Sequence, residues 1–78
     1  MYYVYILRLR DGTFYTGSTS DLKRRFKEHN KKIVQSTKRL TPVILVFYVV
    51  FSSKNKAIQF EKYLKSSSGF AFRNKHLI

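Results

Sequence analysis

The hydrophobic positions at the start of the chain predict a hairpin of two strands. Tyr2–Leu9 is rich in aromatic and β-branched residues, which is typical of a strand. Asp11-Gly12 is a dipeptide that favours a tight hairpin turn. Thr13–Gly17 is then expected to be the returning strand.

Two lengths of hairpin loop fit this segment, and they place the tyrosines differently. With a two-residue loop of Asp11 and Gly12, Tyr5 and Tyr15 point to opposite faces of the sheet. A three-residue loop starts one residue earlier and holds Gly12 in a left-handed bulge, so that Tyr5 pairs with Gly17. Tyr5 and Tyr15 then share a face. Cooperation between the two tyrosines therefore requires the longer loop.

After the hairpin the apolar spacing changes from that of a strand to that of a helix. Ser18–Ser20 offers hydroxyl groups for an N-cap, and Asp21 suits the positive end of a helix dipole. Helical spacing then runs from about Asp21 to Lys32. We expect its apolar stripe to consist of Leu22, Phe26 and Ile33.

Two polar side chains of this helix, Arg25 and His29, are expected at the edge of the apolar stripe. They lie one turn apart on the same side of the helix. The remaining cations are expected to face solvent: Lys23, Arg24, Lys27 and Lys31. Arg25 and His29 are therefore separated from the solvated basic face.

The middle of the chain predicts a loop followed by a third strand. Val34–Thr41 is mostly polar and basic, and Pro42 is tolerated at the first position of a strand. Val43–Phe51 is an uninterrupted apolar run, which is typical of a strand covered on both faces. This run predicts a sheet with helices on each side.

The last part of the chain predicts a second helix and an unassigned tail. Ser52-Ser53 provides an N-cap, Lys54–Lys65 has helical spacing, and Ser66–Gly69 ends the helix. Glu61 falls inside an apolar stripe formed by Ala57, Ile58 and Leu64, with Phe60 alongside. The tail, Phe70–Ile78, mixes apolar and basic residues and predicts no regular element.

Length and composition set limits on the fold. Seventy-eight residues make one small domain, 1–78, with a limited core. Seven Phe and six Tyr supply enough apolar material for a folded globule. The absence of cysteine excludes disulfides and thiolate zinc sites. The longest apolar run, Pro42–Phe51, is too short to span a bilayer, and no signal-peptide pattern occurs, so we expect a cytoplasmic protein.

Charge is the strongest indication of a partner. Sixteen Lys and Arg stand against four Asp and Glu, which gives a net charge of +12. Self-repulsion of this size favours a polyanionic partner, and nucleic acid fits better than an anionic membrane, whose helices usually carry large apolar faces. The alternative is a basic protein without a dedicated anion site. The cations expected to bind nucleic acid are Lys23, Arg24, Lys27, Lys31, Lys38, Arg39, Arg73 and Lys75.

Among the four acids, Glu61 is the unusual one. The turn accounts for Asp11, the helix start for Asp21, and a polar helix face for Glu28. Glu61 lies on an apolar face, where an ionised carboxylate needs a partner. That partner is either a neighbouring Lys or Arg in a salt bridge or a bound Mg²⁺ ion. A single carboxylate argues against a two-metal nuclease.

The other candidate groups each have a functional and an ordinary interpretation. Arg25 presents a planar fork suited to phosphate, or adds one more charge to a basic helix. His29 relays a proton, or is a hydrogen-bonded histidine at a helix edge. Tyr5 and Tyr15 take part in catalysis, or pack in the sheet. No Ser-His-Asp set, phosphate loop, HExxH motif or Cys/His cluster occurs.

The order of these positions resembles the GIY-YIG nuclease family. Tyr3-Val4-Tyr5 stands where the family normally has Gly-Ile-Tyr, and Tyr15-Thr16-Gly17 stands where it has Tyr-Ile-Gly. Asp21–Asn30 is similar to the family's arginine-and-histidine helix, and Phe60–Lys65 to its glutamate helix. Asn74 lies where some members carry a functional asparagine. The resemblance extends over nearly the whole chain, and small stand-alone bacterial members are the most similar.

The resemblance implies a fold and a set of roles. The fold is α/β of the α+β type, with a small three-stranded antiparallel sheet flanked by helices. The activity is phosphodiester cleavage with one divalent metal, Mg²⁺ or Mn²⁺. By the same resemblance, Tyr15 is the base or proton relay, assisted by Tyr5 and His29. Arg25 stabilises the phosphate, Glu61 binds the metal, and Asn74 is an auxiliary residue.

These observations lead to a hypothesis of function and two alternatives. The hypothesis is a metal-dependent endonuclease that acts on DNA, or on RNA, and selects branched or damaged structures, as in DNA repair. Specificity would come from the basic surface, a homodimer or a protein partner. One alternative is an inactive nucleic-acid-binding module, and the other is a subunit of a repair complex.

Overall fold

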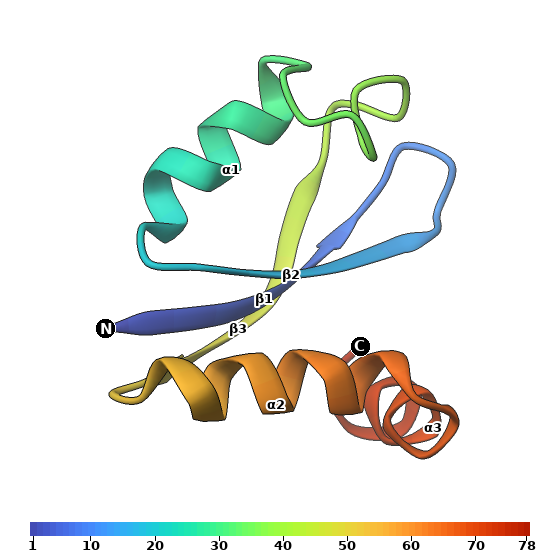
Figure 1. Ribbon diagram of the computed structural model, residues 1–78. Helices are drawn as coiled ribbons and strands as arrows, with labels where there is room; N and C mark the ends of the chain where they lie inside the picture. Colours follow the sequence, from blue (N-terminus) through green and yellow to red (C-terminus); the bar gives the residue numbers. More distant parts are fainter.

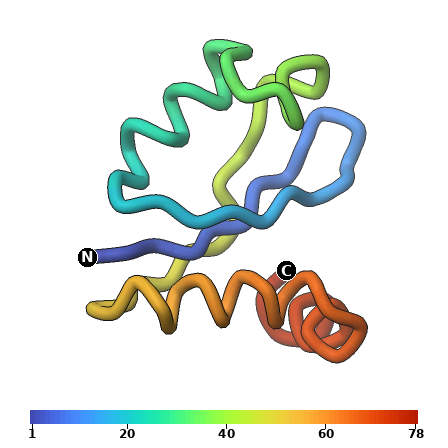
Figure 2. Tube along the Cα trace, viewed as in Figure 1, coloured from blue at the N-terminus to red at the C-terminus, as the bar shows by residue number.

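The computed structural model describes residues 1–78 and shows a sheet with helices on both faces (Figure 1). Helix α1 covers one face, and α2 with α3 lies against the other, as the chain trace also shows (Figure 2). The sheet is antiparallel in the order β2-β1-β3, so β1 is central and β2 and β3 are edges. The elements are β1 (Tyr2–Arg8), β2 (Phe14–Thr19), α1 (Leu22–Asn30), β3 (Ile44–Phe51), α2 (Lys54–Lys65) and α3 (Ser67–His76).

The hairpin between β1 and β2 has the three-residue loop. The backbone N–H of Gly12 donates to the carbonyl of Leu9 at 2.9 Å, and Gly12 has a φ of 88°, in the left-handed region. Tyr5 pairs with Gly17 across the two strands. Tyr5 and Tyr15 consequently share a face, with ring centroids 6.3 Å apart. Of the two loops that the sequence allows, the structure has the one that brings the tyrosines together.

The core consists of two clusters, one on each face of the central strand. The cluster beneath α2 contains Val4, Ile6, Ala57 and Leu64, and the cluster beneath α1 contains Tyr5, Leu7, Leu9 and Val43. Strand β1 alternates between the clusters because successive side chains point to opposite faces. Strand β1 is therefore the strand that is covered on both sides.

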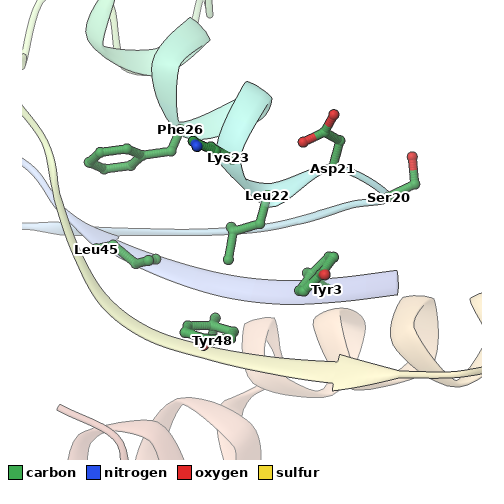
Figure 3. A pocket seen from close by; sticks show the side chains of 8 residues that line it. All are labelled: Tyr3, Ser20, Asp21, Leu22, Lys23, Phe26, Leu45 and Tyr48. Carbon is green, nitrogen blue, oxygen red and sulfur yellow. The ribbon is translucent and has the colours of Figure 1, made fainter. Parts of the chain in front are cut away.

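The prediction that Val43–Phe51 is covered on both faces is wrong. Strand β3 is an edge, and its alternate side chains Ile44, Val46, Tyr48 and Val50 are exposed by 52, 38, 53 and 41%. A hollow of about 490 Å³ separates α1 from β3, with Leu22 and Phe26 on one side and Tyr48 on the other (Figure 3). Helix α1 is too far from β3 to cover the outer half of the sheet.

Helix α1 is shorter than predicted and starts later. Asp21 is itself the N-cap, and its side chain accepts a hydrogen bond from the backbone N–H of Arg24 at 3.0 Å. Ser18 and Thr19 belong to β2, because the strand continues to pair with β1 beyond Gly17. The helix ends at Asn30, so the prediction that Ile33 joins the buried stripe is wrong; Ile33 is 66% exposed.

Helix α2 agrees with the prediction, whereas α3 was not expected from the sequence. Ser53 caps α2 by accepting from the N–H of Lys56 at 3.3 Å. Ser66 caps α3 by accepting from the N–H of Gly69 at 3.2 Å. A Cβ on Gly69 would collide with the backbone carbonyl of Tyr63, so the glycine permits α3 to lie close against the end of α2. None of the three helices is long and apolar enough to cross a membrane.

Candidate active site

A chain of three buried polar side chains lies between the sheet and α1. The Tyr5 hydroxyl lies 2.9 Å from Nε2 of His29, and Nδ1 of His29 lies 2.8 Å from Oγ1 of Thr37. All three residues are at most 1% exposed. The central strand supplies Tyr5, the last turn of α1 supplies His29, and the loop after α1 supplies Thr37. Nothing in the sequence singles out Thr37, which lies in a polar loop without a periodic pattern.

Burial sets the protonation of this chain. It raises the pKa of Tyr5 to about 12, although the nearby Arg25 guanidinium acts in the opposite direction. Burial also lowers the pKa of His29, and the charge of Arg25 lowers it further. Tyr5 and His29 are therefore both neutral at pH 7 and share one proton along their hydrogen bond. Such a pair can pass a proton between the phenol and the imidazole.

Tyr15 is the more accessible of the two tyrosines at this site. Its side chain is half-buried, and its ring centroid lies 5.1 Å from that of His29. Gly17, two residues further along β2, makes the approach of both tyrosines sterically feasible. A Cβ at Gly17 would lie 2.6 Å from the Tyr5 hydroxyl oxygen and 3.0 Å from the Tyr15 ring. The glycine is thus required by packing, because the tyrosines occupy the space of a side chain.

Arg25 lies at the border between this cluster and solvent. Its Nη1 donates to Oε1 of Glu28 at 3.0 Å, and about a third of its side chain is exposed. The bond to Glu28 raises the pKa of Arg25, so the guanidinium stays charged. Glu28, which sequence reasoning assigned only to a polar helix face, holds Arg25 in place. Its position three residues after Arg25 was the signal that could have shown this.

Glu61 reaches the sheet from α2 and has two partners. The Ser18 hydroxyl donates to Oε1 at 2.6 Å, and the Lys65 ammonium donates to Oε2 at 2.8 Å. The salt bridge that the sequence offered as one interpretation is therefore present. Burial acts to raise the pKa of Glu61, but the bonds from Lys65 and Ser18 outweigh it and hold the pKa below its ordinary value. The carboxylate is ionised at neutral pH.

The tyrosine cluster and Glu61 approach β2 from opposite faces. Along β2, Tyr15 and Gly17 face α1, whereas Ser18 faces α2. Tyr15 nevertheless lines a hollow of about 300 Å³ together with Lys65, the salt-bridge partner of Glu61. The charge of Glu61 also contributes to the raised pKa of Tyr5. The candidate site therefore extends across both sides of an exposed strand edge.

The donor set limits the kind of metal that this site can hold. No group of three or more His, Cys, Asp and Glu side chains occurs anywhere in the chain. Glu61 is the one carboxylate at the β2 edge, with the Ser18 hydroxyl beside it. An all-protein metal cage is excluded, whereas a hard cation that keeps most of its water fits one carboxylate and substrate oxygens.

The remaining predicted residues lie outside the tyrosine cluster. Asn74 is exposed on α3, and its Oδ1 accepts two hydrogen bonds from Arg73, at 3.0 and 3.2 Å. Of the predicted nucleic-acid-binding cations, Lys38 and Arg73 are half-buried, and the others are exposed: Lys23, Arg24, Lys27, Lys31, Arg39 and Lys75. Most lie on α1 and the loop after it, whereas Arg73 and Lys75 lie on α3, across the sheet.

Fold and site together define a small α/β domain that has paired tyrosines on its first two strands, an arginine and a histidine on its first helix, and a glutamate on its second. Residues 1–75 match the GIY-YIG catalytic domain, and the chain belongs to this family. The resemblance seen in the sequence is thereby confirmed over almost the whole chain.

Relatives of similar length occur in Staphylococcus and Streptococcus. The chain is 40% identical over 68 residues to a UPF0213 protein of Staphylococcus haemolyticus, covering 86% of this chain and 83% of the relative. It is 44% identical over 64 residues to a UPF0213 protein of Streptococcus pyogenes, covering 81% of this chain and 70% of the relative. The solution NMR structure of a UPF0213 protein from Bacillus halodurans superposes with a TM-score of 0.60 at 37% identity, covering 96% of this chain and 84% of that one. The predicted three-stranded fold is confirmed.

Proposed function

We propose that this protein is a metal-dependent endonuclease that hydrolyses phosphodiester bonds in DNA. The observation that carries the proposal is the assembly at the β2 edge. An accessible phenol, the buried Tyr5–His29 pair next to it and an ionised glutamate adjoin one edge strand, and a charged arginine lies on the helix that carries His29. Membership of a family defined by a catalytic domain supports this assignment.

The accessibility of the side chains suggests their division of labour. Tyr15, which is half-buried, contacts the attacking water and removes its proton. Tyr5 and His29, which are fully buried, carry a proton along their hydrogen bond, and Thr37 holds the imidazole in position. Arg25 pairs with the phosphate as negative charge develops on its oxygens.

Glu61, assisted by Ser18, is the group that would hold Mg²⁺ or Mn²⁺. The ammonium of Lys65 lies 2.8 Å from the carboxylate, so a cation already neutralises this position. A bound divalent ion would displace Lys65 and would supply Lewis-acid stabilisation of the phosphate. The lone carboxylate suits Mg²⁺, which retains several waters and uses phosphate oxygens as ligands.

The substrate class follows from charge. A net charge of +12, with exposed cations on α1 and on α3, supports binding to the backbone of DNA from more than one side. Such contacts carry no base sequence, which favours recognition of branched or damaged structures. A homodimer or a protein partner would add selectivity, and RNA is the competing substrate.

The decisive test compares cleavage with binding. Purified protein is incubated with nicked, branched and single-stranded DNA and with RNA, in Mg²⁺, in Mn²⁺ and in EDTA. We expect metal-dependent cutting that falls by about 100-fold or more in Tyr15→Phe and Glu61→Ala, because each removes one acid–base or metal-binding group. Tyr48→Phe, on the exposed face of β3, is the matched control and should cut normally.

One observation favours a rival function, a binding module without activity. Lys65 already satisfies Glu61, and a permanent salt bridge would exclude metal. Lys65→Ala separates the two possibilities. If the ammonium only competes with metal, the variant should cut at a lower Mg²⁺ concentration than the wild type. If wild type and variant both bind DNA without cutting it under every metal condition, the enzyme is ruled out and the binding module remains.

A further inference from the structure

The hollow on the α2 side of the β2 edge has an aromatic and cationic wall that the proposed catalysis does not use. Besides Tyr15 and Lys65, it is lined by Phe14, Phe70 and Arg73. The Arg73 guanidinium lies 4.5 Å from the centroid of the Phe70 ring and 5.2 Å from that of Phe14. We call this space the Phe70 hollow.

Helix α3 holds this wall in a fixed position. Ser66 caps the helix, and Gly69 lets it lie directly against α2, at the right of Figure 1. Phe70 and Arg73 are three residues apart, so they project from the same face of α3. Asn74 accepts two hydrogen bonds from Arg73, which fix the plane of the guanidinium. The hollow is therefore preorganised.

Packing alone does not account for Phe70. Its side chain is 52% exposed although it sits on the rim of a cavity and next to two cations, Lys65 and Arg73. A large exposed ring beside positive charge is characteristic of surfaces that bind planar, anionic ligands, since the ring stacks on the planar group and the cations pair with the anion.

A nucleotide with an unpaired base is the ligand that fits these features. At about 300 Å³ the hollow lies at the lower end of the size range of small-molecule sites. Bases inside a duplex hide their faces in the stack, so only an unpaired base can present its face to Phe70. Lys65 and Arg73, which line the same space, supply positive charge for the adjacent phosphates.

We infer that the Phe70 hollow binds one unpaired nucleobase beside the phosphate that is cut, so that the preferred substrate has a single-stranded segment at the cleavage point. This inference rests on the proposed function, because it takes the β2 edge as the place where the phosphate lies. Tyr15 connects the two, since it lines the hollow and also contacts the Tyr5–His29 cluster.

The test measures binding in EDTA, where no cutting occurs. The probes are fluorescent DNA hairpins with a single-stranded overhang, whose junction fixes the register, and an abasic nucleotide is moved stepwise along the overhang. Wild-type protein should lose about 5- to 100-fold in affinity at one position, the range expected from one stacked base. Phe70→Ala should weaken binding of the intact probe similarly and remove the sensitivity to the abasic nucleotide.

Phe72→Ala is the matched control, because Phe72 lies on the same helix but packs against Tyr63 and His76 outside the hollow. It should retain both the affinity and the abasic profile, and Phe70→Tyr should restore stacking. A second readout needs no variant: 2-aminopurine at the sensitive position of the overhang should lose fluorescence when wild-type protein binds, because its base becomes stacked.

Failure of the inference and failure of the proposed function give different results. A flat abasic profile, or equal losses in Phe70→Ala and Phe72→Ala, overturns the nucleobase site whether or not the protein cuts. A single sensitive position that depends on Phe70, in a protein that never cuts with metal, supports the nucleobase site and rules out the nuclease.

Discussion

The two edge strands of the sheet have opposite character, and the less hydrophobic one is the better enclosed. Strand β2 contains four hydroxyl-bearing residues and a glycine after Phe14, yet Thr16 and Gly17 are buried. Strand β3 contains no charged residue, yet it exposes Tyr48 and Val50. What differs is the set of neighbours: α1 and α2 both send side chains to β2, whereas β3 faces the hollow that separates it from α1.

This difference shows that hydrogen-bond partners can decide the burial of an edge strand. At β2, the groups that approach from both helices are satisfied, and no buried side-chain nitrogen or oxygen lacks a partner. Burying polar groups is costly unless each finds a partner, so the β2 edge depends on complete pairing. The β3 edge depends on apolar packing instead: Phe47, Val49 and Phe51 pack against the cluster beneath α2, and Leu45 packs against the cluster beneath α1.

The largest effect is expected from removing the imidazole of His29, which lies between the sheet and α1. His29→Ala should lower the free energy of unfolding by about 3–5 kcal/mol, because it leaves two hydroxyls, of Tyr5 and Thr37, buried without their partner and opens a cavity. Urea denaturation measures the loss. Tyr48→Ala on β3 is the control and should cost less than about 1 kcal/mol. Equal losses would contradict the proposed contrast between the edges.

A smaller effect is expected from adding one methyl group at the crossing of the tyrosines. Gly17→Ala should cost about 1–3 kcal/mol, since the new Cβ would lie 2.6 Å from the Tyr5 hydroxyl and would push it away from His29. Gly12→Ala meets no atom within 4 Å and should cost about 1 kcal/mol, through its positive φ alone. DNA cleavage should be lost in Gly17→Ala and kept in Gly12→Ala. Cleavage that is kept in Gly17→Ala and lost in Gly12→Ala would place Gly17 outside the site.

The hydroxyl of Thr37 is expected to act through His29. Thr37→Val should cost about 1–2 kcal/mol, because Nδ1 loses its partner in a buried site, whereas Thr37→Ser should cost less. A purely structural role would change stability alone. NMR titration of the His29 ring separates the cases: a positioning role requires that the titration of His29 shifts in the valine variant and is preserved with serine.

A smaller effect on the free energy of unfolding is expected from a change of pH. The pKa of His29 is lowered by burial, so the unfolded state binds more protons than the folded state at pH values just below the ordinary 6.5. The free energy of unfolding keeps its full value above pH 6.5. It decreases as the pH falls towards the lower pKa that His29 has in the folded state. Chemical denaturation at a series of pH values should show this decline, which His29→Gln should remove and His76→Gln, on exposed α3, should leave unchanged.

The smallest effect is expected on the open face of β3. Val50→Thr should change stability by no more than about 0.5 kcal/mol, because the residue is already 41% exposed. Val4→Thr makes the same chemical change in the fully buried centre of the sheet and should cost about 1–3 kcal/mol. Similar midpoints for the two variants would show that β3 is covered in solution.

Much of the fold could be predicted from the sequence, and the predictions that were wrong have physical causes. The bounds and cap of α2 followed from local spacing and from Ser53. The burial of β3 did not, because an unbroken apolar run has no periodicity that reveals which face is covered. Helix α3 was missed because Ser66–Gly69 is typical of a helix end, whereas here Gly69 provides a close helix–helix contact.

The sequence revealed the site residues that stand out by their own type and position. It did not reveal the residues that act by holding another side chain. Tyr5, Tyr15 and His29 were singled out, and the structure places their rings together. Thr37 was not, because it acts by holding another side chain, and hydrogen-bond geometry across a loop leaves no trace in residue spacing. Glu28 was also missed, although its position three residues after Arg25 on one helix was a readable signal.

Ser66 is the single residue that connects the last two helices. Its backbone N–H caps the end of α2 by donating to Tyr63, and its hydroxyl oxygen caps the start of α3. Since each residue of a helix turns the chain by roughly 100°, one extra residue at this joint would swing Arg73 away from Phe14 while the sheet stayed intact. Insertions at this joint would therefore change the wall of the Phe70 hollow without disturbing the residues of β2, so the hollow and the strand edge can vary independently.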